Sequence, residues 1–339
     1  MNNFLLELFS EEIPSSDQVA GRQFLEEYFL DYLETSRLPF SEINTFSSPR
    51  RLVVVIKGIS KCAKSSSFEK RGPKIDCDEK ALNGFINANN VRRDQLATKD
   101  LKGSKYYFII EETAGKGSRQ ILTSSIERLI DKFKWKKSMR WGSNNLKWIR
   151  PLRSILAIEY SAQGIASPLK PNVDGVYVGS QTVGHRFMST SPISISSFDE
   201  YSKYLRENFT EYDQKQRKQK ILMQIDMLTK EKYLEPIKDE NLLEEVSGLV
   251  EWPIALMGDI SNDFLGLPEE ILQSVMRTHQ RYFAVRSTKT RKIIKFITIA
   301  NIEAKDNGKH ILEGNKRVLN SRLADARFFW EIDIAKVKN

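Results

Sequence analysis

Residues 42–59 read EINTFSSPRRLVVVIKGI, and two strand-like runs within them organise the N-terminal part of the chain. The runs at 42–46 and 51–59 are rich in β-branched residues, which predicts a pair of neighbouring strands. Pro49 lies in the turn between them and cannot donate a hydrogen bond to a sheet. We therefore expect the turn to interrupt the pairing and to present the side chains of Arg50 and Arg51.

The sequence on both sides of this strand pair alternates strand-length apolar runs with amphipathic helices. FLLELF at the start is typical of a strand, and the Pro and Ser residues at 14–16 favour the start of a helix that continues to about residue 34. The Ser- and Lys-rich residues 60–76 predict a loop. After that loop we expect a helix near 78–89, a strand at 106–112 and a helix near 117–133. This order is typical of a mixed α/β or α+β domain.

The second half of the chain predicts more strands around a helical insertion near 197–250. Residues 212–232 have the clearest helical stripe, with Ile221 and Ile225 on one face and many lysines on the other. Strands are expected at 153–161, 176–188, 254–260, 282–287 and 295–301, and helices from Pro268 and near 310–333. The expected fold is α+β or mixed α/β, with several domains, mixed sheets and packed helices. The predicted domains are an N-terminal α/β domain at 1–135, a second α/β domain with the helical insertion at 136–305, and the start of a helical domain at 306–339.

The composition is typical of a globular protein and excludes several classes of site. The 339 residues are 40% hydrophobic and 29% charged, and the longest apolar runs are too short for a membrane span. Cys62 and Cys77 fit no zinc-binding spacing, and the three histidines lie far apart in the sequence. The sequence has no phosphate-binding glycine loop and no nucleophile elbow, so we assign no catalytic residue, metal or cofactor to this chain. Its acidic N-terminus does not resemble a signal peptide, so a cytoplasmic location is expected.

A strongly basic stretch with three tryptophans is the main functional candidate. Residues 132–154 read KFKWKKSMRWGSNNLKWIRPLRS, with eight Lys or Arg and no Asp or Glu, in a chain whose net charge is +9. Such a charge excess favours polyanionic partners, of which nucleic acid is the commonest, although it also serves solubility. Each tryptophan either stacks on a base or belongs to the core with basic side chains extending past it. The predicted RNA-binding residues of this stretch are Lys134, Lys136, Lys137, Arg140, Trp141, Arg150 and Arg153.

Two shorter segments also gather polar side chains. MRTHQRYF at 276–283 places Arg277, His279, Gln280 and Arg281 at a predicted helix end, where they either contact RNA or complement the helix dipole. We include these four residues, together with Arg50 and Arg51, among the RNA-binding candidates. VGHRFM at 183–188 places His185 at a strand end, where a structural role is expected.

Seven segments together resemble one family, the beta subunit of the heterotetrameric bacterial glycyl-tRNA synthetase. They follow the order of that family and span almost the whole chain. The segments are LLELFSEEIP, SPRRLVV, KSMRWGSNNLKWIRPLRSILAI, VGHRFM, LLEEVSGLVEWPIALMG, LPEEILQSVMRTHQRYF and EAKDNGKHILEGNKRVLNSRLADARFFWE.

The resemblance implies a role in the ATP-dependent attachment of glycine to tRNA(Gly). It implies that ATP, with Mg, is used by the complete enzyme at a site on the alpha subunit, and that the beta subunit supplies most of the tRNA contacts. The implied partners are the alpha subunit, tRNA(Gly) and a second beta subunit within an α2β2 tetramer.

The chain departs from this family in length, because family members are about twice as long and continue into further helical and anticodon-binding domains. It is accordingly expected to be a fragment, a split gene product or a truncated relic. Two alternative functions remain open: a stand-alone, non-catalytic RNA-binding fragment, and an editing hydrolase, which glycine needs less than larger amino acids do. The aromatic residues within 325–333, near the end of the last helix, are expected to be partly exposed and to promote self-association.

Overall fold

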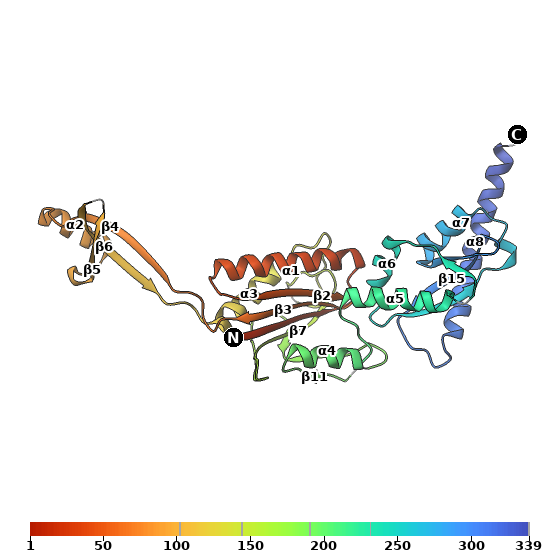
Figure 1. Ribbon diagram of the computed structural model, residues 1–339, viewed down its shortest axis with the longest axis horizontal. Coiled ribbons are helices and arrows are strands. Elements are labelled where there is room, and N and C mark those ends of the chain that lie inside the picture. The colour runs from red at the N-terminus through yellow and green to blue at the C-terminus, as the bar shows by residue number, and fades with distance from the viewer. Residues whose placement is uncertain (102, 144, 190, 231, 338–339) are drawn as a thin grey trace.

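A computed structural model describes residues 1–101, 103–143, 145–189, 191–230 and 232–337. The molecule is elongated, and three parts follow one another along its long axis (Figure 1). We call them the body (residues 2–63 and 116–210), the arm (residues 64–115) and the C-terminal unit (residues 211–337). Mixed sheets with packed helices occur as the sequence predicted, and the expected α+β fold class is confirmed.

The body is built on a six-stranded mixed sheet. Its order is β2-β3-β1-β7-β8, and β9 pairs with β7 in parallel, whereas the other neighbours are antiparallel. The pairing of β2 with β3 confirms the strand pair predicted from residues 42–59. The strands are β1 (Asn2–Ser10), β2 (Glu42–Ser48), β3 (Arg51–Ile59), β7 (Leu152–Ser161), β8 (Ala166–Pro168) and β9 (Tyr177–Gly179).

Helices cover both faces of this sheet because its central strands are apolar on both sides. Phe4, Leu6 and Leu8 pack in one core with α1 (Ser15–Thr35) and α3 (Ser118–Lys132), whereas Leu5 packs in a second core with α4 (Phe198–Glu207). Successive strand residues point to opposite faces, so one continuous run supplies both cores. Figure 1 shows α1 and α4 on opposite sides of the strands. A small ladder of β10 (Gln181–Thr182) and β11 (Ile193–Ser194) precedes α4.

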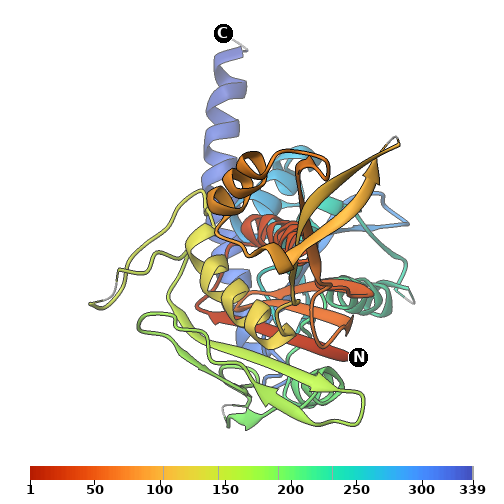
Figure 2. The ribbon, with the colours of Figure 1, turned by 90° about the vertical axis from the view of Figure 1, so that its left-hand side faces the viewer.

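The arm projects from the body as a separate antiparallel sheet of order β4-β6-β5 (Figures 1 and 2). Its two ends meet at the body, where the Ala63 amide donates to the Lys116 carbonyl at 2.9 Å. The loop predicted at 60–76 is wrong for β4, whose side chains are mostly exposed and therefore lack a strong apolar pattern. The arm elements are β4 (Ser66–Lys74), α2 (Glu79–Asn89), the 3₁₀ turn η1 (Arg93–Gln95), β5 (Leu96–Leu101) and β6 (Ser104–Thr113).

The C-terminal unit contains a four-stranded antiparallel sheet of order β12-β14-β15-β13. Helices α5 and α6 pack on one face, and α7 and α8 pack on the other. A short π-helical turn, η3, follows α7. The elements are α5 (Gln214–Thr229), β12 (Leu234–Pro236), α6 (Glu240–Ser247), β13 (Ile254–Asp259), η2 (Asn262–Phe264), α7 (Glu269–Val275), η3 (Met276–Gln280), β14 (Phe283–Ser287), β15 (Ile293–Ala300) and α8 (Lys309–Val337).

The parts of the structure do not divide where the sequence placed the domain boundaries. The boundary predicted after residue 135 falls within the body, because β7 pairs with β1 along nine residues. Helix α8, which the sequence assigned to a further helical domain, packs through Leu319 and Leu323 in the core of the C-terminal unit. We therefore propose the body, the arm and the C-terminal unit as the domains of this chain.

A buried arginine links the body to the C-terminal unit. The Arg51 Nε donates to Glu7 Oε2 at 3.1 Å, and its Nη1 pairs with Glu251, which precedes β13. Tyr201 of α4 donates to Glu7 Oε2 at 2.6 Å, and Ser48 donates to Glu251 Oε1 at 2.8 Å. Arg51, Glu7 and Tyr201 have no exposed surface, so each charge of the cluster is held by partners and not by water.

The two carboxyls of this cluster respond to it in opposite directions. Burial raises the pKa of Glu7 despite the nearby guanidinium. Burial also disfavours the charged form of Glu251, but the Arg51 guanidinium and the Ser48 hydroxyl outweigh it, and the pKa of Glu251 is lowered. Glu251 therefore stabilises the fold above the pKa of an unfolded glutamate, about 4.3. That contribution is lost as the pH falls through the lowered pKa of the folded state.

We predict that Glu251→Gln lowers the free energy of unfolding by about 3–5 kcal/mol at pH 7, because it leaves the buried Arg51 with one carboxylate. Urea denaturation followed by circular dichroism measures the change. Glu42→Gln is the matched control, since it breaks the half-exposed pair with Lys57 and should leave the urea midpoint unchanged. Equal midpoints for all three proteins would show that the buried pair contributes nothing to stability.

The aromatic end of α8 is partly uncovered, as the sequence predicted. Phe328 and Phe329 are 58% and 64% exposed, whereas Trp330 packs at the edge of the core of the C-terminal unit. The two phenylalanine rings contact each other edge-on, with centroids 5.6 Å apart. An exposed apolar pair of this kind favours association, because burial removes its surface from water.

We predict that the chain self-associates through this pair and that Phe328→Ser with Phe329→Ser shifts it toward the monomer. Sedimentation velocity over a range of concentrations measures the shift. The control replaces Ile165 and Tyr177 of the body, which are similarly exposed at 72% and 58%, with serine. If the unmodified chain sediments as a monomer at high concentration, this prediction is wrong.

Candidate nucleic-acid interface

The basic stretch 132–154 forms a loop that leaves the end of α3 and returns into β7. Its two limbs are joined by a pair of backbone hydrogen bonds between Met139 and Trp148, at 2.8 and 3.1 Å. Figure 2 shows the loop between them reaching outward from the body. The segment is therefore an ordered projection with its ends fixed to the central sheet.

Aromatic packing fixes the base of this loop. Trp148 has no exposed surface and lies edge-on to Trp135, with ring centroids 5.2 Å apart. Trp135 stacks on Phe133 at 4.3 Å, and Trp141 is partly buried against the same core. The tryptophans thus chiefly anchor the loop, and Trp141, the indole predicted to contact RNA, keeps only part of its surface exposed.

The cations of the loop remain at the surface. Among the residues that the structure describes, none of Lys134, Lys136, Lys137 and Arg140 has an ion-pair partner, and all four are exposed. Arg150 is exposed and donates to the Ile149 carbonyl at 2.9 Å. Unpaired surface cations can contact phosphates without first breaking an internal salt bridge.

Arg153 differs from the other cations because an acid already holds it. Its Nη2 lies 2.6 Å from Glu11 Oε1, and Glu11 also pairs with Arg186. The side chain of Arg153 is 61% exposed. A phosphate at Arg153 would therefore compete with Glu11.

The structure does not present Arg50 and Arg51 as the turn at Pro49 predicted. Arg51 lies in the buried cluster, and Arg50 is 9% exposed with its guanidinium 4.5 Å from the centre of the Phe9 ring. The segment after β1 covers the turn, because the Ser10 amide donates to the Arg50 carbonyl at 2.8 Å. Backbone packing, which the local sequence does not reveal, places both arginines inside.

The candidates at 276–283 lie on the C-terminal unit, away from the basic loop (Figure 1). Arg277 Nε lies 2.7 Å from Asp239 Oδ2, and Arg281 Nε lies 2.9 Å from Glu245 Oε1, so both arginines tie η3 to α6. His279 is exposed and Gln280 is half-buried. These four residues do not share a surface with 132–154.

His185 is buried, as a structural role requires. The Phe187 amide donates to its Nδ1 at 3.3 Å, and burial lowers the pKa of the imidazole. Within the described part of the chain, no group of three or more His, Cys, Asp or Glu side chains is placed to hold a metal ion. No helix there is long and apolar enough to cross a membrane.

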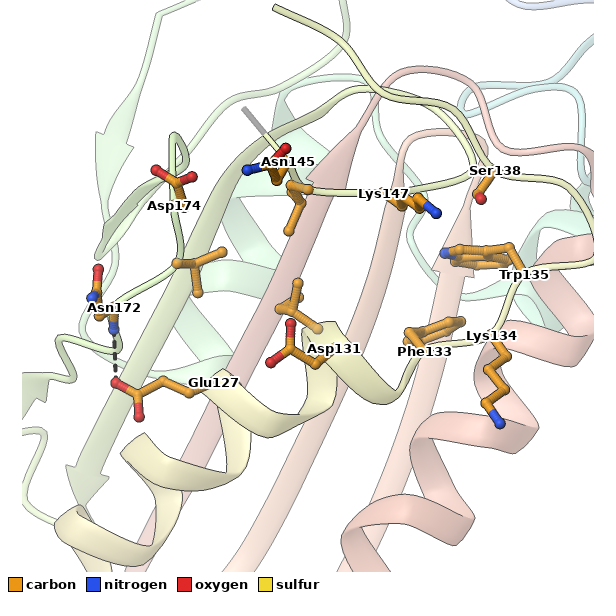
Figure 3. A pocket seen from close by; sticks show the side chains of 13 residues that line it. Glu127, Asp131, Phe133, Lys134, Trp135, Ser138, Asn145, Lys147, Asn172 and Asp174 are labelled. Atoms are coloured by element: carbon orange, nitrogen blue, oxygen red, sulfur yellow. Dashed lines mark hydrogen bonds between the residues drawn. The ribbon is translucent and has the colours of Figure 1, made fainter. Parts of the chain in front are cut away.

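A cavity that sequence reasoning missed opens beside the basic loop. Its volume is about 900 Å³, and it lies between α3, the loop and residues 172–174 (Figure 3). The charge run could have revealed Lys147, but nothing in the sequence joins residues 172–174 to α3. The residues that line it are Glu127, Ile130, Asp131, Phe133, Lys134, Trp135, Ser138, Asn145, Leu146, Lys147, Asn172, Val173 and Asp174.

One hydrogen bond holds the third wall of the cavity in place. The Asn172 amide donates to Glu127 Oε1 at 2.8 Å, which fixes residues 172–174 against α3. Asp131 and Asp174 also line the cavity, but neither bonds to another side chain in the described ranges. Their carboxylates are therefore available to accept hydrogen bonds from a ligand.

A family comparison decides what kind of protein carries this loop and cavity. The sequence profile described as "Glycyl-tRNA synthetase beta subunit" matches residues 4–338. The chain belongs to this family. The resemblance seen in the sequence is thereby confirmed.

Named relatives agree along the whole chain. It is 42% identical over 338 residues to a glycine–tRNA ligase beta subunit of Cereibacter sphaeroides, and the match covers 100% of this chain and 48% of the relative. The corresponding protein of Paracoccus denitrificans is 41% identical over 338 residues, with 100% and 49% covered. That of Rhodospirillum centenum is 35% identical over 356 residues, with 99% and 50% covered. The chain thus spans about half the length of the glycyl-tRNA synthetase beta subunits that it matches.

Proposed function

We propose that this chain is the tRNA-binding, N-terminal part of a glycine–tRNA ligase beta subunit. In this proposal it binds tRNA(Gly) and supports the ATP-dependent attachment of glycine, which takes place on an alpha subunit. The family match over residues 4–338 is the main support, and the exposed, unpaired cations of the basic loop supply a surface for RNA. Of the predicted residues, Lys134, Lys136, Lys137, Arg140 and Arg150 are the ones that we propose contact phosphates.

The proposal assigns ATP and Mg to the alpha subunit and no cofactor to this chain. It places the protein in the cytoplasm, in an α2β2 tetramer with two alpha subunits and a second beta subunit. The names of the relatives support the partnership, since each is a beta subunit of a glycine–tRNA ligase. A stand-alone RNA-binding fragment remains the second candidate, because the match covers about half of each relative.

We predict that the chain binds a tRNA(Gly) transcript with strong salt dependence. Replacing Lys136, Lys137, Arg140 and Arg150 with alanine should flatten the plot of log affinity against log salt concentration. Each lost phosphate contact is expected to change the slope by about 0.7–0.9. Filter binding at several salt concentrations measures both affinity and slope.

The control for this experiment removes the same charge elsewhere. Lys215, Lys230, Lys232 and Lys238 are exposed on α5 or in the segment that follows it, and replacing all four with alanine should leave the slope nearly unchanged. If both variants lose affinity equally, the binding is a non-specific effect of net charge. If neither loses affinity, RNA binds elsewhere on the molecule.

We also predict that the chain alone catalyses no glycine-dependent exchange of pyrophosphate into ATP. The physical reason is that its sequence has no ATP-binding loop, and the proposed activation site belongs to the alpha subunit. Co-expression with the alpha subunit, followed by co-purification and a glycylation assay, separates the two candidate functions. A complex that charges tRNA supports the ligase role, whereas tRNA binding without a complex supports the stand-alone fragment. Exchange by the chain alone would contradict the assignment.

A further inference from the structure

We propose that the cavity beside the basic loop binds a single unpaired nucleobase that carries an exocyclic amino group, with the attached phosphate at Lys134 and Lys147. The inference rests on the proposed RNA-binding function and names the part of the RNA that this site would hold. It assigns a use to the one feature of the loop that phosphate contact does not explain, a hollow with apolar walls.

The size and walls of the cavity suit a flat aromatic ring. Its volume of about 900 Å³ is within the range of pockets that hold small ligands. Ile130, Leu146 and Val173 supply aliphatic walls, and Phe133 and Trp135 supply aromatic ones. A base gains stacking and dispersion energy against such walls whatever its sequence context.

The aromatic wall is rigid before any ligand arrives. Phe133 and Trp135 stack with an angle of 23° between their planes, and Trp148 packs against both from the interior. Trp148 is fully buried, so this group of rings cannot rotate without opening the core. A fixed wall loses little conformational entropy when a base binds.

Polar groups are separated along the cavity in the order that a nucleotide requires. Figure 3 shows Lys134, Lys147 and Ser138 toward the aromatic end, and Asp174, Asn172 and Asp131 away from it. The two lysines have no acidic partner in the portion of the chain that the structure describes. A phosphate held at the lysines would direct its base toward the aspartates.

The aspartates give the site a preference among bases. An ionised carboxylate only accepts hydrogen bonds, so it pairs with the amino group of cytosine and repels the carbonyl oxygen that uracil has at the same position. Glu127 is not part of this preference, because it already accepts the Asn172 amide. Asp131 and Asp174 are therefore the residues that we expect to select the base.

The ligand must be unpaired to enter. A base inside a duplex keeps its hydrogen-bonding edge against its partner, and enzymes that need this edge take the base out of the stack. The cavity is closed by α3 on one side and by residues 172–174 on another, so only a nucleotide extruded from a helix or located in a single strand fits.

The test compares CMP with UMP, which differ at the position that the aspartates are expected to read. Binding to the full chain is followed by NMR through the indole N–H signal of Trp135, assigned with Trp135→Phe. We expect CMP to bind about tenfold more tightly than UMP, the discrimination typical of a well-placed base contact. Asp131→Asn with Asp174→Asn should abolish this preference, because an amide both donates and accepts.

A second pair of variants tests the phosphate end. Lys134→Ala with Lys147→Ala should weaken CMP and UMP equally and leave the binding of cytidine, which has no phosphate, unchanged. The controls are Lys215→Ala with Lys230→Ala, and Glu26→Gln with Glu27→Gln, which remove the same charges from exposed sites outside the cavity. Circular dichroism confirms that each variant is folded.

The outcomes distinguish this inference from the proposed function. If CMP and UMP bind equally, or the Trp135 signal does not move while tRNA still binds, the cavity is not a base site and the RNA-binding function stands. If the chain binds no tRNA, the proposed function fails, and a CMP preference lost in the aspartate variant would still support a nucleotide site.

Discussion

The buried Arg51 guanidinium is the interaction on which the arrangement of the molecule depends. It joins Glu7 of the central strand β1 to Glu251 of the C-terminal unit, 200 residues further along the chain than Arg51. A guanidinium without carboxylates in this dry position would cost several kcal/mol, so the two parts cannot separate without exposing or orphaning a charge. Carbonyl groups at Val183 and Gly184 complete its hydrogen bonding. The geometry between the body and the C-terminal unit therefore follows from one side chain.

This cluster also explains what several of the shared sequence segments do. Four of the seven segments that carry the family resemblance supply its members: Glu7, Ser48 with Arg51, Val183 with Gly184, and Glu251. Their charged residues suggest surface chemistry when they are examined one at a time. In the structure they hold the protein together, and the RNA-facing charge lies in a different segment.

The basic loop combines a rigid base with free charge. Buried rings at Phe133 and Trp148 hold it to the body, while its lysines extend into solvent without acidic partners among the described residues. Such a loop presents its cations in one arrangement before RNA arrives, which limits the entropy lost on binding. The sequence identified the charge run, but it could not separate Trp148, which is wholly structural, from Trp135, which also lines a cavity.

The sequence by itself determined the elements whose patterns are strong and local. The strand pair of residues 42–59, helix α1 and the helix near the end of the chain follow from apolar periodicity, and the family follows from segments read in order. The arm strand β4 lacked that periodicity because its side chains are mostly exposed. Only the tertiary structure decided that Arg51 is buried, that Arg277 and Arg281 brace a helix, and that residues 172–174 close a cavity against α3. The physical reason is that charge and polarity are properties of a residue, whereas burial and partnership depend on contacts between segments that the chain order leaves far apart.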